Sequence, residues 1–146
     1  MQLRAGPAPC STDHTPEFII ESVRCWCCAR REKLAAQPRL VQVLAPYSCE
    51  MLSPVFDALF ATFEGCLRRS IIDGRLEYVS VDERELLTLM DHPNSSMERF
   101  ANSGIAAILH MALISARAMC ETVLARKCSF ELPLTGFGFR DAPSPA

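Results

Sequence analysis

Cysteine is the residue type with the greatest chemical potential in this sequence, and three cysteines crowd into Cys25-Trp26-Cys27-Cys28. On a helix, Cys27 shares a face with Trp26, whereas Cys25 and Cys28 lie three residues apart on the other face. Two thiolates at that spacing supply half of a tetrahedral zinc site, which needs four ligands. A second pair with matching spacing does not occur in the sequence. Zinc binding or a redox response at Cys25 and Cys28 is therefore an alternative to a purely structural role.

No pattern typical of an enzyme occurs in the chain. The sequence has no Gly-x-Ser-x-Gly elbow, no glycine-rich phosphate loop and no dinucleotide fingerprint. The carboxylates Asp82, Glu83 and Glu85 fall in a first helical turn, where the helix dipole favours acidic residues. We expect no catalytic residue, no small-molecule substrate and, apart from the zinc alternative, no cofactor.

Charge is segregated along the chain. The basic residues gather near the end of the first expected helix, in a patch composed of Arg24, Arg30, Arg31, Lys33 and Arg39. Acidic residues dominate positions 77–98, where Arg84 is the single cation. The two regions can face each other within one chain or between chains, or bind partners of opposite sign.

A DNA-binding regulator that uses the basic patch is a further alternative. The net charge of −2 and the pI of about 5.9 exclude a globally basic nucleic-acid binder. Nucleic acid is therefore not the partner that the sequence favours.

Length and composition indicate one folded domain. The chain has 146 residues, of which 49% are apolar, and this share excludes wholesale disorder. Residues 1–9 lack the apolar core of a signal peptide, so we expect a reducing, cytoplasmic location. The longest apolar run, 104–116, is shorter than the roughly 20 residues of a membrane span, so no membrane contact is expected.

Helical signals fill the first half of the chain after residue 14. Thr15-Pro16-Glu17 predicts a helix that runs to about Gln37, and a short second helix is expected over 38–45. Ser53-Pro54 begins the cleanest amphipathic pattern in the chain. Its apolar residues follow a helical period and are Val55, Phe56, Leu59, Phe60, Phe63, Cys66 and Leu67.

Two capping boxes are expected in the second half. Ser80 with Glu83 begins a helix that ends near Asp91, and 95–98 begins the last helix. That last helix carries one continuous apolar stripe, namely Ile105, Ile108, Leu109, Ala112, Ala116, Met119, Cys120 and Val123. Its opposite side holds further apolar residues, Met111, Ile114 and Ala118. A helix that is apolar on most sides is buried centrally or covered by a partner.

The segment 130–139 is too apolar for a free tail, and Pro133 with two glycines predicts that it is not helical. We expect it to pack on the bundle or to dock on another chain as an extended peptide, with Phe130, Phe137 and Phe139 as contacts.

Together these patterns predict an all-α fold, a single-domain bundle of about five helices with two long central ones. Residues 1–14 form an N-terminal arm, 15–128 the helical domain and 129–146 the tail. We expect a small cytoplasmic regulator or adaptor that acts by protein–protein interaction. A homodimer that covers Met111, Ile114 and Ala118 is the simplest arrangement.

Overall fold

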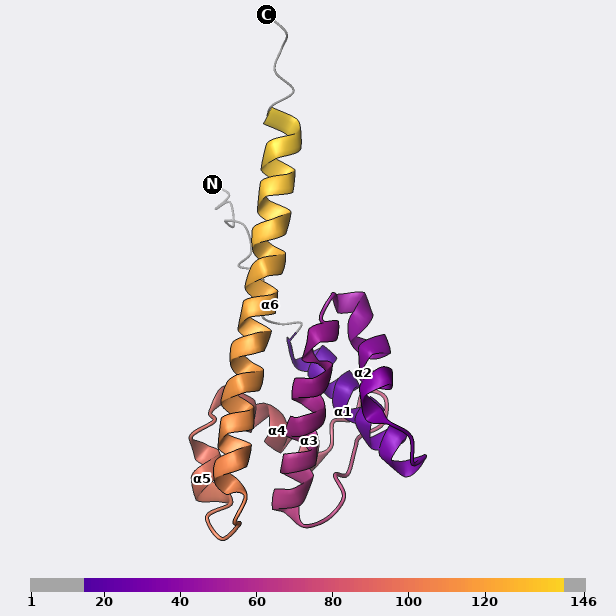
Figure 1. Ribbon diagram of the computed structural model, residues 1–146, viewed down its shortest axis with the longest axis vertical. Helices are drawn as coiled ribbons and strands as arrows, with labels where there is room; N and C mark the ends of the chain where they lie inside the picture. The colour runs from indigo at the N-terminus through magenta and orange to yellow at the C-terminus, as the bar shows by residue number, and fades with distance from the viewer. Residues whose placement is uncertain (1–14, 141–146) are drawn as a thin grey trace, which may run out of the picture.

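Helices account for all the regular structure in the computed structural model, which describes the backbone of residues 15–140 and the side chains of residues 17–125. Their order is α1 (Thr15–Arg31), α2 (Ala36–Leu44), α3 (Ser53–Leu67), α4 (Val81–Asp91), α5 (Ser95–Arg99) and α6 (Ala106–Arg140), with 3₁₀ turns η2 (Ala45–Tyr47) and η3 (Glu50–Leu52) between α2 and α3 (Figure 1). The predicted all-α bundle is confirmed, with six α-helices in a single domain over residues 15–140. Residues 1–14 and 141–146 lie outside the described part.

α3 lies at the centre of the bundle, with α1 and α2 on one side and α6 on the other (Figure 1). Its predicted apolar stripe is confirmed, because Phe56, Leu59, Phe60 and Phe63 are fully buried. The ring of Phe56 lies 5.5 Å from that of Phe60, and Trp26 of α1 meets Phe60 edge-on at 6.0 Å. This aromatic packing joins α1 to α3 and fixes the angle at which α1 crosses the bundle.

The first helix ends earlier than the sequence predicts. α1 stops at Arg31 because Lys33 adopts a left-handed conformation, with φ of 57°. The amide of Leu34 donates to the carbonyl of Ala29 at 2.9 Å, and the amide of Lys33 donates to that of Arg30 at 3.1 Å. These two bonds form a Schellman motif, which closes a helix by local backbone geometry. Pro38, expected to end the first helix, instead lies in the first turn of α2, where a missing amide is tolerated.

The last helix predicted from residue 95 is two helices. The hydroxyls of Ser95 and Ser96 donate to the carbonyls of His92 and Pro93, so the expected capping box does not form. The helix α5 ends at its C-cap residue Phe100, whose ring is buried beside Phe63. The capping box of Ser80 at the start of α4 is confirmed.

The backbone of α6 continues to Arg140, so the prediction that 130–139 is not helical is wrong. Pro133 removes one amide donor and costs a helix interior about 3 kcal/mol, but the hydrogen bonds on either side of it can still form. The side chains from residue 126 onward, including Phe130, Phe137 and Phe139, lie outside the described residues. Whether they contact the bundle therefore stays a prediction.

Candidate interaction surfaces

The half-buried Cys25 and Cys28 of α1 stand apart from other metal-binding side chains. Within the described residues there is no group of three or more His, Cys, Asp or Glu that could hold a metal ion. Burial raises the pKa of the Cys25 thiol, Arg39 counteracts this rise, and the neighbouring Cys28 adds to it. A thiol with a raised pKa is a weaker nucleophile and metal ligand at neutral pH.

The basic patch is largely neutralised by carboxylates from other elements. Arg30 pairs with Glu64 at 3.2 Å, Arg31 with Asp73 at 2.8 Å and Arg39 with Glu32 at 2.8 Å, while Arg24 pairs with Glu83. A phosphate group would have to compete with these carboxylates for the guanidinium groups. The Arg24–Glu83 pair also shows that the basic and acidic regions of the sequence meet within one chain.

Glu83 anchors the loop between α3 and α4 from inside the protein. Its side chain is fully buried and accepts a hydrogen bond from Arg24 Nε at 2.8 Å. It also accepts the backbone amides of Gly74 at 2.8 Å and Ser80 at 2.9 Å. Burial alone would raise the pKa of Glu83, but the hydrogen bonds from Arg24 and the two amides outweigh it and lower the pKa.

Asp82 anchors the beginning of the same loop. Both of its carboxylate oxygens accept from Arg69, at 2.6 and 2.8 Å, and one accepts the amide of Ile72 at 2.8 Å. The hydrogen bonds from Arg69 lower the pKa of Asp82, although burial opposes them. We call residues 68–80 the anchored loop, because two buried carboxylates of α4 hold its backbone in one conformation.

Gly74 allows the anchored loop to close tightly. A Cβ atom at this position would clash with the carbonyl of Tyr78 and approach the side chains of Arg24 and Glu83 to 2.8 Å. The guanidinium of Arg24 donates hydrogen bonds to the carbonyls of Leu76 at 2.7 Å and Tyr78 at 3.0 Å. Several backbone groups of this long irregular segment thus have hydrogen-bond partners within the protein.

The anchored loop ends in a turn that holds a leucine in an unfavourable conformation. Arg75 and Tyr78 exchange backbone hydrogen bonds of 3.2 and 2.9 Å across this turn. Leu76, between them, has φ of 51° and is 89% exposed. Glycine is the residue that this conformation favours, and strain in an over-determined turn is typical of functional sites.

Large apolar side chains surround that turn without being covered. Ile72 is 62% exposed, Tyr78 80% and Val81 79%, in addition to Leu76. We call Ile72, Leu76, Tyr78 and Val81 the turn surface. The turn surface was not among the surfaces predicted from the sequence. The available signal was a cluster of apolar residues in a segment with neither helical period nor neighbouring strand.

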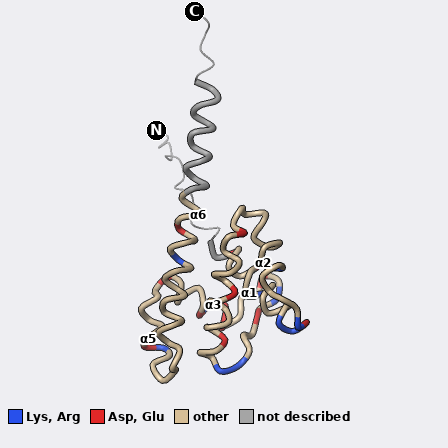
Figure 2. The backbone as a smooth tube through the Cα atoms, in the orientation of Figure 1, with Lys and Arg blue, Asp and Glu red and all other residues tan. Residues whose placement is uncertain are grey.

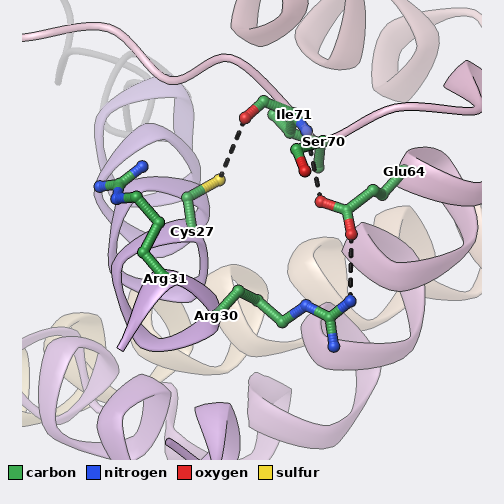
Figure 3. A pocket seen from close by; sticks show the side chains of 6 residues that line it. All are labelled: Cys27, Arg30, Arg31, Glu64, Ser70 and Ile71. Atoms are coloured by element: carbon green, nitrogen blue, oxygen red, sulfur yellow. Dashed lines mark hydrogen bonds and ion pairs between the residues drawn. The ribbon is translucent and has the colours of Figure 1, made fainter. Parts of the chain in front are cut away.

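A pocket of about 420 Å³ lies beside the anchored loop (Figure 3), lined by Cys27, Arg30, Arg31, Glu64, Ser70 and Ile71. Its polar groups bind one another, because Glu64 accepts from Arg30 and from the amide of Ile71, both at 3.2 Å. Burial, reinforced by Asp73, raises the pKa of the Cys27 thiol to about 12. That thiol is protonated at neutral pH, so the pocket contains no activated nucleophile.

α6 presents a second uncovered surface. One side of the helix packs on α3, α4 and α5, and Leu109, Leu113 and Ala116 are fully buried there. The other side is exposed, and we call it the outer face of α6. It comprises Ala107, Ile108, Met111, Ile114, Ser115, Arg117, Ala118, Glu121, Thr122 and Ala125, and Arg117 forms an ion pair with Glu121 at 3.2 Å. The predicted exposure of Met111, Ile114 and Ala118 agrees with this placement, whereas Ile108, expected in the core, is 58% exposed.

Charge is sparse on the described part of α6 compared with α1 and the anchored loop (Figure 2). Ala106–Ala125 is long and apolar enough, by length and composition, to cross a membrane, with a mean hydropathy of 1.4. The core helix of a soluble protein passes the same test. Arg117 and Glu121 lie within the window, where a bilayer would disfavour them.

No family model matches the chain, and no curated protein or solved structure matches it at a significant level.

Proposed function

We propose that this protein is an interaction module, a regulator or adaptor that binds another protein through the turn surface and self-associates through the outer face of α6. The observation that carries the proposal is the combination of exposure and restraint at the turn. Leu76 and Tyr78 are 89% and 80% exposed, yet Arg24 holds the carbonyls of both.

Restraint matters because ordering a flexible loop on binding reduces affinity. Each immobilised side chain or loop residue costs free energy when a complex forms, so a loop fixed in advance binds more tightly for the same contacts. The amides of Arg75 and Tyr78 and the carbonyls of Arg75, Leu76 and Tyr78 already have partners within the protein, which lowers the cost of removing water from the turn. Tyrosine is one of the residue types enriched among the residues that contribute most to the binding free energy of interfaces, and Tyr78 is such a residue on this turn.

The partner predicted by this surface has an apolar pocket for Leu76 and Tyr78. Arg75 and Arg84 flank the turn surface and have no ion pair among the described residues, whereas Glu77 supplies one negative charge beside them. A carboxylate-bearing rim on the partner would complement this balance.

The test is quantitative affinity capture from native cells with three versions of the full chain. These are the natural sequence, Leu76→Ser with Tyr78→Ser, and a control with Leu34→Ser and Val41→Ser, which changes two exposed apolar residues elsewhere. We expect the turn variant to lose its partner by about tenfold or more, since truncated anchors typically cost at least that much. Equal recovery of the partner by all three versions would contradict the proposal. The affinity of a partner that the turn variant fails to capture is then measured with purified proteins.

A further inference from the structure

We propose that Cys25 and Cys28 of α1 form a two-thiolate site for a soft monovalent cation, Cu(I). The two residues lie about one turn apart on the same side of the helix. Both side chains are half-buried, so their thiols can be reached from solvent and are partly shielded from it. The site lies outside the turn surface and the outer face of α6, and it does not depend on either surface binding a partner.

The spacing of the two cysteines suits a bridging ion better than a disulfide. Residues three apart on a helix have Cβ atoms roughly 5–6 Å apart, whereas a disulfide needs about 3.5–4.5 Å. Closing a disulfide between Cys25 and Cys28 would therefore distort α1. A bridging ion holds two sulfur atoms at about twice the length of a metal–thiolate bond of roughly 2.3 Å. Two thiols at this spacing reach that separation by rotation of their side chains.

The number of ligands decides which metals fit the pair. Across the described residues no group of three or more His, Cys, Asp or Glu could hold a metal ion, so Cys25 and Cys28 have no third ligand there. Zinc takes four protein ligands in structural sites and three in catalytic ones. Thiolates are ligands that Cu(I) prefers, and two of them in a linear arrangement complete its coordination. A pair with no further ligand therefore favours Cu(I) over zinc.

Cys27 lies between the two residues in the sequence but belongs to another side of the helix. Its buried thiol donates to the carbonyl of Ile71 at 4.0 Å and faces the pocket beside the anchored loop (Figure 3). Burial, reinforced by Asp73, raises the pKa of this thiol to about 12, so it stays protonated. Cys27 is therefore the internal reference for the pair, because it is a cysteine of the same helix turn without a second thiol on its side.

Two guanidinium groups lie within electrostatic reach of the pair. Burial raises the pKa of the Cys25 thiol, and Arg39 of α2 opposes this rise. Arg31 interacts with Cys28 through its charge. Neither arginine is free of carboxylates, because Arg39 pairs with Glu32 at 2.8 Å and Arg31 pairs with a carboxylate of the anchored loop at 2.8 Å. The two ion pairs leave the surroundings of the thiols close to electrical balance.

Glu21 adds a negative charge one turn before Cys25, and its carboxylate accepts a hydrogen bond from the hydroxyl of Tyr47 at 3.0 Å. This charge opposes a second thiolate and favours a bound cation. A thiol that coordinates a metal loses its proton outright, so the raised pKa of Cys25 lowers the affinity without preventing binding. We therefore expect the affinity for Cu(I) to increase with pH.

Anaerobic titration of the reduced full chain with Cu(I), in competition with the chromophoric chelator bicinchoninate, measures the site. Cys25→Ser and Cys28→Ser each remove one ligand. Cys27→Ser is the matched control, because its hydroxyl can keep the hydrogen bond to the carbonyl of Ile71. We expect the natural chain and the control to withhold one equivalent of Cu(I) from the chelator. Each ligand variant should bind it about a hundredfold or more less tightly, since even residues that only support a ligand contribute roughly 10- to 100-fold.

X-ray absorption at the copper edge counts the sulfur neighbours in the natural chain without any substitution, and we expect two in a linear arrangement. Three sulfur neighbours would overturn the two-thiolate site, as would equal affinity of the natural chain, Cys25→Ser and Cys28→Ser, which would place copper on other cysteines. A natural chain that yields all its Cu(I) to bicinchoninate would overturn the proposal as well. Retention of one equivalent of zinc, lost in the two ligand variants, would overturn the choice of Cu(I).

Discussion

The anchored loop and α6 both display apolar side chains to solvent, but they do so by opposite physical means. The loop has no regular structure and is held by two buried carboxylates. Glu83 accepts hydrogen bonds from the guanidinium of Arg24 and from two backbone amides, and Asp82 accepts them from the guanidinium of Arg69 and from one backbone amide. α6 is fixed by its own backbone hydrogen bonds and by apolar packing of one face, including the fully buried Leu109 and Leu113. A display surface can therefore be rigid without secondary structure, provided that the interior supplies the missing hydrogen-bond partners.

Removal of the buried charge beneath the anchored loop should have the largest effect on the stability of the protein. Glu83→Gln leaves the guanidinium of Arg24 without its carboxylate and turns an amide group toward backbone donors. Removing one partner of a buried ion pair costs about 3–5 kcal/mol, and the partial exposure of Arg24 favours the lower end of that range. Urea unfolding followed by circular dichroism measures the loss.

Glu77→Gln is the matched control, because Glu77 lies in the same loop, is exposed and has no ion pair among the described residues. Surface substitutions of this kind change stability by less than about 0.5 kcal/mol. Equal losses in the two variants would mean that the buried carboxylate is not what holds the loop.

Acid should loosen the loop before it affects the packing of α6. The pKa values of Asp82 and Glu83 are lowered in the folded protein, so the folded state binds protons less readily than the unfolded chain. Their stabilisation is complete above the unfolded values of about 4 and is lost as pH falls through the lower folded values. Urea midpoints should fall below about pH 4 and fall less steeply in Glu83→Gln. Identical acid profiles for the two proteins would contradict this linkage.

Leu76→Gly should change stability less than Glu83→Gln does and should have a separate effect on binding. A left-handed conformation costs a residue with a side chain roughly 1–2 kcal/mol, and glycine avoids this cost but gains entropy in the unfolded chain. We expect a net stabilisation of up to about 1 kcal/mol in thermal unfolding, together with loss of partner capture. Destabilisation by the glycine would show that the leucine side chain packs on the protein rather than serving a partner.

The helical elements could be predicted because their signals are local. The period of α3 and the capping box of Ser80 depend on residues within a few positions of one another, and both are present in the structure. Local sequence signals did not predict where α1 ends, because that end depends on the backbone conformation of one residue. Lys33 in a left-handed conformation ended α1 early, and no residue type in that segment indicates it.

The functional surfaces could be predicted only in part. Met111, Ile114 and Ala118 were placed on an open face because helical period alone separates two sides of α6. The turn surface was missed because its conformation depends on contacts distant in sequence, such as Arg24 with Glu83, 59 positions apart. Asp82 and Glu83 were correctly assigned to the first turn of α4, but their burial depends on where Arg24 and Arg69 come to lie.

Amide hydrogen exchange tests most directly whether buried carboxylates hold the anchored loop. The amides of Ile72, Gly74 and Ser80 donate to Asp82 or Glu83, whereas no acceptor is seen for the amide of Glu77 within the described residues. We predict that the first three exchange slowly, at rates comparable to helical amides, and that Glu77 exchanges rapidly. Exchange of all four at the rate of an unstructured peptide would contradict the account.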